Sequence, residues 1–348
     1  MKKPTEIAKK FGYEGRIQTI GDGHINNTYL VIPLEGHKLI LQKINRQVFR
    51  KPEELMANLV KILDHLARNK YPYKPLRIIH TTSGDPYWSD PSGFWRAFEY
   101  IDDCSTLTHT NNTRIAWMTA EAYSVFINTL AGLSPSVIRK TIPDFNNPGK
   151  RFEEFIDSVN EAVTDRADYA GSLIEQAMDF SDITRQYAEI TADLPLRVTH
   201  NDTKLSNILF GKKLDRVVAI IDFDTIMPGY VMNDFGDLAR SICNTGREDE
   251  ADISKVSFST SLFKAISEGY VSTLKDTLTP KENENLLFGV RIMIYIQFIR
   301  FLSDYLIGDR YYRIAYPEQN LNRANVHLKL LLDFQEKEEM LMEIISEV

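Results

Sequence analysis

Apolar and polar positions divide the chain into a strand-rich first part and a helical remainder. Residues 16–32 hold two runs of β-branched and aromatic residues around the turn-forming sequence GDGHINN, which predicts a β-hairpin. The strand pattern returns in three later segments, residues 37–45, 75–80 and 93–100. From about residue 106 the apolar spacing is helical, except around residues 198–224. This order predicts an α+β fold in which a small sheet precedes a larger helical part.

Two predicted helices stand out, one in each part of the chain. The first begins at Pro52 with acidic residues in its first turn, as helix N-termini prefer. Its apolar residues recur at helical spacing: Leu55, Leu59, Ile62, Leu63 and Leu66. The second, residues 286–306, is the most apolar late segment, but four polar residues interrupt it: Arg291, Gln297, Arg300 and Asp304. The sequence therefore predicts no membrane span there.

Composition narrows the class of protein. A chain of 348 residues with 43% hydrophobic content can bury a large core, and its length predicts two domains. The net charge of −7 argues against a nucleic-acid-binding protein, which usually has a basic face. Cys104 and Cys243 are the two cysteines, too few for a disulfide framework, and the N-terminal segment lacks the apolar core of a signal peptide. We expect a cytoplasmic protein with no membrane and no obligatory protein partner.

The segment from Val198 to Asp224 carries the strongest chemical pattern. It contains His200, Asp202 and Asn207, then an apolar strand that ends on Asp222. Phosphoryl transfer needs a carboxylate to take the proton of the attacking hydroxyl and oxygen ligands to hold Mg²⁺ against the nucleotide phosphates. Asp202 suits the first role, and Asn207 with Asp222 suits the second. Single Asp and Asn residues are common in loops, but the full array with a strand between its parts indicates a kinase active site.

These motifs resemble a known group of enzymes. The strings HNDTKLSN and IDFD resemble the aminoglycoside phosphotransferase and choline kinase superfamily, which is distantly related to protein kinases. The longer strings LRVTHNDTKLSNILF, IDFDTIMPG and GDGHINNTYLV are similar to the N-acetylhexosamine 1-kinases, and the similarity extends from about Gly12 to about Leu332. The resemblance implies a two-lobed, protein-kinase-like α+β fold that uses ATP and Mg²⁺. Residues 1–100 would form the nucleotide-binding lobe, and residues 101–348 the helical lobe with the catalytic loop, the metal site and the sugar acceptor site.

The first lobe supplies the expected nucleotide contacts. The loop between the first two strands would face the phosphates or the substrate with Gly21, Gly23, His24, Asn26 and Thr28, although a plain hairpin turn and a surface histidine are alternatives. Lys43 on the third strand would contact the phosphates, or else faces solvent, and its glutamate partner, Glu53 or Glu54, stays open. The backbone around Glu99 and Ile101 would bond the adenine edge, unless this is an ordinary last strand.

The second lobe supplies the remaining expected roles. Lys204 would reach the transferred phosphoryl group, and His200 would support the loop backbone. Asp224 would contact the metal or the substrate, with a loop-capping role as the alternative. The resemblance implies that Asp237 begins a helix and accepts hydrogen bonds from the catalytic loop. It also implies sugar contacts from Arg300 and Tyr311, although an i,i+4 pair between Arg300 and Asp304 is an equal alternative.

Two other functions remain open at this stage. Another small-molecule kinase of the same superfamily would act on choline, an aminoglycoside or homoserine. A nucleotide-binding pseudoenzyme would act as a regulator or scaffold, but such proteins commonly lose the base or a metal ligand, and Asp202, Asn207 and Asp222 are all present. The sequence therefore favours a sugar kinase, while the choice between gluco and galacto acceptors stays open.

Overall fold

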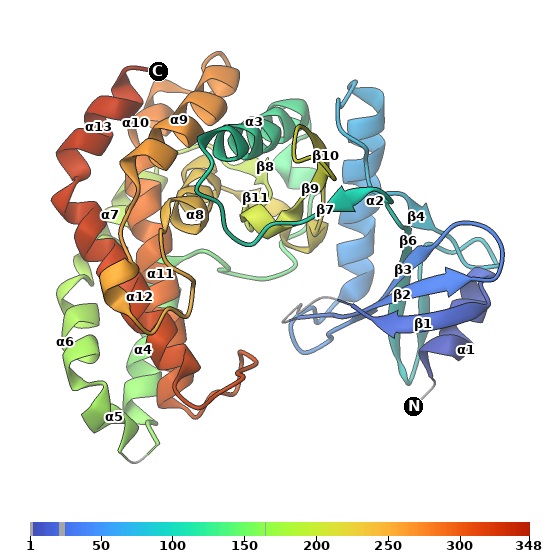
Figure 1. The fold of residues 1–348 in the computed structure, drawn as a ribbon, viewed down its shortest axis with the longest axis horizontal. Coiled ribbons are helices and arrows are strands. Elements are labelled where there is room, and N and C mark those ends of the chain that lie inside the picture. Colours follow the sequence, from blue (N-terminus) through green and yellow to red (C-terminus); the bar gives the residue numbers. More distant parts are fainter. Residues whose placement is uncertain (1–2, 21–24, 164) are drawn as a thin grey trace.

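Two lobes of unequal size make up the protein in a computed structural model that describes residues 3–20, 25–163 and 165–348 (Figure 1). The smaller lobe holds α1 (Pro4–Ala8), β1 (Gly15–Thr19), β2 (Asn27–Pro33), β3 (Leu39–Ile44), α2 (Pro52–Arg68), β4 (Ile78–Ile79), β5 (Trp88–Asp90) and β6 (Gly93–Glu99). Its strands form one sheet in the order β1-β2-β3-β6-β4, with β5 also pairing β6, and every pair is antiparallel. The predicted hairpin is confirmed, since Arg16 pairs with Ile32.

The larger lobe is mainly helical. Its helices are α3 (Thr113–Leu130), α4 (Pro148–Asn160), α5 (Arg166–Tyr169), α6 (Gly171–Asp179), α7 (Asp182–Thr191), α8 (Val231–Cys243), α9 (Thr260–Leu274), α10 (Pro280–Glu284), α11 (Leu286–Leu306), α12 (Gln319–Glu336) and α13 (Glu338–Ser346). Its short strands are β7 (Cys104–Ser105), β8 (Arg197–Thr199), β9 (Ile208–Gly211), β10 (Val217–Ile220) and β11 (Met227–Gly229). The predicted α+β fold with a sheet-rich and a helical lobe is confirmed.

The two faces of the N-terminal sheet differ in what covers them. Successive strand residues point to opposite faces. Leu39 and Leu41 of β3 pack with Trp95 and with α1 in one apolar cluster, whereas Ile44 and Phe94 belong to the main core with α2 and the larger lobe. Successive residues of β3 and β6 therefore alternate between the face that packs on α1 and the face that meets α2 and the larger lobe.

The larger lobe is built around α11. This helix packs against α4, α8 and α12, and its residues are mostly buried. It is long and apolar enough to cross a membrane by composition alone, but 72% of its most apolar window is buried inside the protein, as in the core helix of a soluble fold. Gly236 and Gly289 bring α8 and α11 unusually close, because a Cβ on Gly289 would lie 2.0 Å from the backbone oxygen of Met232.

Two small sheets hold the segment that carries the predicted chemistry. β8 pairs with β11, and β9 pairs with β10 on one side and β7 on the other. β7 follows directly from the end of β6, so the chain leaves the N-terminal sheet after Glu99 and joins a sheet of the larger lobe at Cys104. The domain boundary at residue 100 stays a prediction. These pairings set residues 200–207, predicted to be the catalytic loop, beside residues 222–226, predicted to be the metal loop.

Candidate active site

Asp202 and Asn207 face each other across the catalytic loop. The Asn207 side chain donates through Nδ2 to the Asp202 carbonyl at 2.9 Å and to Asp202 Oδ2 at 2.8 Å. A short 3₁₀ turn, Leu205–Asn207, folds the loop back so that these two side chains meet. With Nδ2 committed to Asp202, Oδ1 of Asn207 is the amide atom left to bind a cation.

Lys204 forms an ion pair with Asp202, the predicted base. Its Nζ lies 2.9 Å from Asp202 Oδ2. Burial raises the pKa of Asp202, but the charge and hydrogen bond of Lys204, together with the hydrogen bond from Asn207, more than offset this and leave that pKa below its ordinary value. Burial lowers the pKa of Lys204, but Asp202 and Asp222 raise it well above its ordinary value. Asp202 is therefore held ionised and Lys204 charged, with 40% of the lysine side chain exposed and able to meet a phosphate.

Asp234, at the start of α8, holds the backbone of the catalytic loop. Its carboxylate accepts the backbone N–H of His200 at 2.8 Å and of Asn201 at 2.7 Å. The prediction from sequence that Asp237 accepts hydrogen bonds from the catalytic loop is wrong. Asp237 instead accepts Arg240 Nε at 2.9 Å. The two carboxylates are three residues apart on one helix, and only the first lies against the loop.

His200 links the two loops from inside the protein. It is fully buried, its Nε2 lies 3.2 Å from the Ile221 carbonyl, and rings of Tyr123, Phe126 and Phe223 surround it. Burial lowers the pKa of His200 to about 4, so the imidazole is neutral near pH 7. This placement suits support of the loops rather than proton transfer to a substrate.

Asp222 presents a carboxylate at the start of the metal loop. Its backbone has φ 62°, and the preceding Ile221 N–H donates to the Asn207 carbonyl at 2.9 Å. Desolvation by surrounding protein, then the carboxylates of Asp224 and Asp202, raise the pKa of Asp222 to about 7. The carboxylate repulsion acts on a residue that solvent reaches. A divalent cation would relieve it, and an Asp oxygen with an Asn oxygen fits the ligands of Mg²⁺, which also keeps waters and phosphates.

Asp224 faces the smaller lobe. Its side chain is almost fully buried, with Oδ1 2.5 Å from Arg96 Nη2 and Oδ2 accepting Asn26 Nδ2 at 2.6 Å. Both partners come from the N-terminal sheet or its first loop. The structure therefore brings Asn26 to the metal loop and directs Asp224 to these two residues, while the metal and substrate roles expected for Asp224 stay predictions.

Arg96, on β6, is a residue that the sequence reasoning missed. It shares a row with Gln42 and Thr28 across three strands: Gln42 Oε1 accepts Arg96 Nε at 3.0 Å and Nη2 at 2.8 Å, and Gln42 Nε2 donates to Thr28 Oγ1 at 3.2 Å. In the sequence, Arg96 is one charged residue inside the strand FWRAFE. A charge at the centre of the strand, with apolar residues on either side, was the available signal.

Lys43 lies on the other face of the sheet. Its Nζ is 5.7 Å from the ring centroid of Trp95, which packs in the cluster beside α1. Neither candidate glutamate pairs with it in the described residues, since Glu54 accepts Lys51 Nζ at 3.1 Å and both Glu53 and Lys51 are exposed. The structure thus does not bring Lys43 to the loop carboxylates, and its expected phosphate contact stays a prediction.

The remaining nucleotide-side predictions fall at the two ends of the sheet. Gly21, Gly23 and His24 lie outside the described residues. Glu99 ends β6 and pairs with Leu39, while its carboxylate lies 3.4 Å from both Lys74 Nζ and Arg77 Nη1. Ile101 is half-buried and follows in the connection to β7. Both residues sit where the chain passes between lobes, as a hinge would.

Arg300 lies among aromatic rings on α11. Its Cζ is 5.5 Å from the ring centroid of Tyr312, 5.8 Å from that of Tyr311 and 5.9 Å from that of Phe145. The alternative pair with Asp304 does not form, because the Asp304 carboxylate accepts the backbone N–H groups of Tyr311 at 2.8 Å and Tyr312 at 2.9 Å. Among the described residues Arg300 has aromatic neighbours and no hydrogen-bonded carboxylate. Tyr311 is 48% exposed and open to a ligand.

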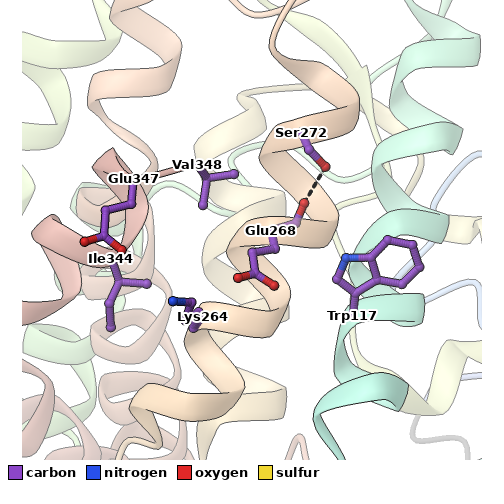
Figure 2. A pocket seen from close by; sticks show the side chains of 7 residues that line it. All are labelled: Trp117, Lys264, Glu268, Ser272, Ile344, Glu347 and Val348. Atoms are coloured by element: carbon purple, nitrogen blue, oxygen red, sulfur yellow. Dashed lines mark hydrogen bonds between the residues drawn. The ribbon is translucent and has the colours of Figure 1, made fainter.

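A separate cavity of about 280 Å³ lies between α3, α9 and the C-terminal end of α13. Figure 2 shows Trp117 on α3, Lys264 and Glu268 on α9, and Ile344 and Glu347 around it. None of the predicted catalytic or metal-binding residues lines this cavity. The predicted site residues lie at the catalytic and metal loops, away from this cavity.

Comparison with known proteins supports a phosphotransferase architecture. Residues 16–258 match the model of a family described as "Phosphotransferase enzyme family". An aminoglycoside phosphotransferase from Alicyclobacillus acidocaldarius subsp. acidocaldarius DSM 446 is similar with a TM-score of 0.64 and 14% identity, over 100% of this chain and 96% of that chain. A microcompartment-associated aminopropanol kinase is similar with a TM-score of 0.62 and 14% identity, over 96% of this chain and 97% of that chain. An amicoumacin kinase in complex with AMP-PNP, Ca²⁺ and Ami has a TM-score of 0.61 and 12% identity to this chain, over 93% of each chain. At these identities the structures establish a shared fold.

Proposed function

We propose that this chain, which belongs to the phosphotransferase enzyme family, is an ATP- and Mg²⁺-dependent kinase that phosphorylates the anomeric hydroxyl of an N-acetylhexosamine. The observation that carries the kinase proposal is the Asp202 carboxylate, bonded to Asn207 at 2.8 Å and paired with Lys204 at 2.9 Å. This is an ionised base beside a cation and a metal ligand, the set that phosphoryl transfer requires.

The proposed reaction is a direct transfer. The acceptor oxygen forms a bond to the γ-phosphorus as the bond from that phosphorus to the β,γ-bridging oxygen breaks, so that ADP leaves. Asp202 orients the hydroxyl and takes its proton, and Lys204 stabilises negative charge on the transferred group. Asn207 and Asp222 would hold Mg²⁺, which, when bound, neutralises charge on the β- and γ-phosphates.

The acceptor assignment rests on the resemblance of the catalytic strings to N-acetylhexosamine 1-kinases and on the surroundings of Arg300. A guanidinium with Tyr311 and Tyr312 beside it suits hydroxyl and amide oxygens and the apolar face of a sugar ring. A cationic acceptor such as choline prefers aromatic rings and acidic groups without a competing cation. The charge of Arg300 therefore favours a neutral acceptor over choline or an aminoglycoside.

The test is ADP release with Mg²⁺ and ATP over a panel of acceptors: N-acetylglucosamine, N-acetylgalactosamine, choline, homoserine, an aminopropanol and kanamycin. We expect turnover on the acetamido sugars that disappears in Asp202→Ala, and the ratio of the two sugars will identify the preferred epimer. Turnover on only the amino alcohols or the aminoglycoside would retain the kinase and reject the sugar. Nucleotide binding with no turnover on any acceptor would favour the pseudoenzyme.

A further inference from the structure

A chain of polar contacts, buried at Arg96 and Asp224 and partly buried elsewhere, connects the N-terminal sheet to the metal loop. Thr28, Gln42 and Arg96 are cross-strand neighbours on β2, β3 and β6, and hydrogen bonds join them in that order. Arg96 then reaches Asp224 with an Nη2 to Oδ1 distance of 2.5 Å, and the two side chains are 3% and 4% exposed. Asn26 reaches the other oxygen of the same carboxylate at 2.6 Å. The smaller lobe therefore engages both oxygens of Asp224.

The position of Asp224 makes this contact relevant to metal binding. It lies two residues after Asp222 within the short 3₁₀ turn Phe223–Thr225, whose N-cap is Asp222, so the contacts of Asp224 help to hold the turn that carries Asp222. Thr225 in the same turn donates through Oγ1 to the His200 carbonyl at 2.8 Å, which ties the metal loop to the catalytic loop. The turn is thus held from the larger lobe on one side and by Arg96 and Asn26 on the other.

The faces of the sheet explain why Arg96 has this role. Gln42 and Arg96 lie on the face that meets the larger lobe, whereas the neighbouring Lys43 lies beside Trp95 on the face that packs against α1. Arg96 Nη1 is a buried donor without a hydrogen-bond partner among the described residues.

We propose that Arg96 is a positioning residue through which the smaller lobe holds the metal loop, so that binding of the Mg²⁺–nucleotide complex depends on the Arg96–Asp224 ion pair. This inference rests on the nucleotide and metal binding of the proposed function and not on the identity of the acceptor. Lysine does not reproduce the planar guanidinium that reaches Gln42 and Asp224 together. Arg96→Lys should therefore bind the Mg²⁺–nucleotide complex more weakly than the wild type but more tightly than a variant without the charge.

The test compares binding of AMP-PNP with and without Mg²⁺ by calorimetry in the full-length protein. We expect Arg96→Met to weaken binding of the Mg²⁺ complex by about tenfold or more, with a change of less than about threefold for AMP-PNP without the metal. The double variant Arg96→Met/Asp224→Asn removes both charges, so it avoids an unpaired buried carboxylate. It should fold where Arg96→Met does not, and it should show the same loss that depends on Mg²⁺.

Arg46→Met is the matched control, because it removes an exposed arginine of the same lobe whose Nη2 donates to Ser89 Oγ at 2.9 Å. Binding of Mg²⁺–AMP-PNP at wild-type strength in Arg96→Met, or in the double variant, would overturn the inference. An equal loss of AMP-PNP binding with and without Mg²⁺ would also overturn it, since a general structural defect affects both. A loss specific to Mg²⁺ in Lys43→Met, with none in Arg96→Met, would overturn it as well. A wild-type protein that binds no nucleotide would overturn the proposed function first.

Discussion

The side-chain amide of Asn207 binds Asp202 twice, at the carbonyl with a distance of 2.9 Å and at Oδ2 with a distance of 2.8 Å. One nitrogen thereby fixes the rotamer of the proposed base and leaves the amide oxygen of the same residue for a metal. The proposed base and a proposed metal ligand therefore hold each other in place. A change in either residue should affect both proton transfer and metal binding.

Asp202→Asn should remove catalysis and leave the fold intact. The variant keeps the size of the side chain and a carbonyl oxygen for Asn207, but it has no carboxylate to take the proton. We expect kcat to fall by about 10² to 10⁴, measured as ADP release on the best acceptor. The melting temperature should change little, and nucleotide binding should persist. Turnover near the wild-type rate would exclude Asp202 as the base.

Asp234→Ala should disrupt the catalytic loop. The change leaves the backbone N–H groups of His200 and Asn201 without their buried acceptor, at a cost of about 1–3 kcal/mol for each unsatisfied group. We expect a lower free energy of unfolding in urea and loss of activity. Asp234→Asn, which retains one acceptor oxygen, should be less damaging. If Asp234→Ala were active and as stable as the wild type, the loop would be held by other contacts.

Arg300→Met should weaken acceptor binding selectively. Methionine retains much of the contact with Phe145, Tyr311 and Tyr312 but loses the charge and its donors. We expect the acceptor KM to rise about tenfold or more while the KM for ATP stays within about twofold. Arg291→Met is the matched control on the same helix, because Arg291 pairs with Glu338. An equal rise in both KM values would contradict an acceptor role.

Gly289→Ala should strongly destabilise the larger lobe. The added Cβ would lie 2.0 Å from the Met232 backbone oxygen, so α8 and α11 must separate. Overpacking of this kind costs about 1–3 kcal/mol or more, and α8 carries Asp234, so activity should fall with stability. Gly171→Ala is the control, since a Cβ there has open space, and it should stabilise slightly or not at all. Equal melting temperatures for the two variants would exclude the close helix contact.

Acid should destabilise the protein partly through His327. This buried imidazole has its pKa lowered to about 4 from 6.5, by burial and then by Arg240, while Glu248 acts in the opposite direction. Because the folded pKa is below the unfolded one, the unfolded state binds the proton first, and this contribution to stability is present above pH 6.5 and is lost as the pH falls toward 4. The expected loss between pH 7 and pH 5 is about 2 kcal/mol.

His327→Gln checks this linkage, because glutamine does not titrate. Urea unfolding at pH 7 and pH 5 should show a smaller difference in the variant than in the wild type. His200 has a similarly lowered pKa, so some dependence on pH should persist. An unchanged difference in His327→Gln would mean that other groups cause the loss in acid.

Some predictions depended only on contacts that are local in the chain. The spacing of Asp202 and Asn207 places both in one short loop, and the structure bonds them directly. The hairpin at residues 16–32, the start of α2 at Pro52 and the strand before Asp222 follow from turn chemistry and periodicity within each segment. Segments of this kind are predictable because the residues that decide them are close neighbours in the sequence.

Other features depended on which surfaces meet in space. Asp234 and Asp237 lie within one turn of α8, and only the docking of that helix on the catalytic loop selects Asp234 to accept the loop N–H groups. The sequence contains both carboxylates in the string NDFGDLA and no local reason to prefer the first.

The sequence by itself determined the strand-rich and helical parts, the family resemblance and the array of Asp202, Asn207 and Asp222. Only the tertiary structure decided that Arg96, and not the adjacent-strand Lys43, meets the metal loop. The physical reason is that neighbouring residues of a strand point to opposite faces of the sheet. Which face meets the larger lobe depends on where α1, α2 and the metal loop pack, and those contacts join residues as far apart as Arg96 and Asp224.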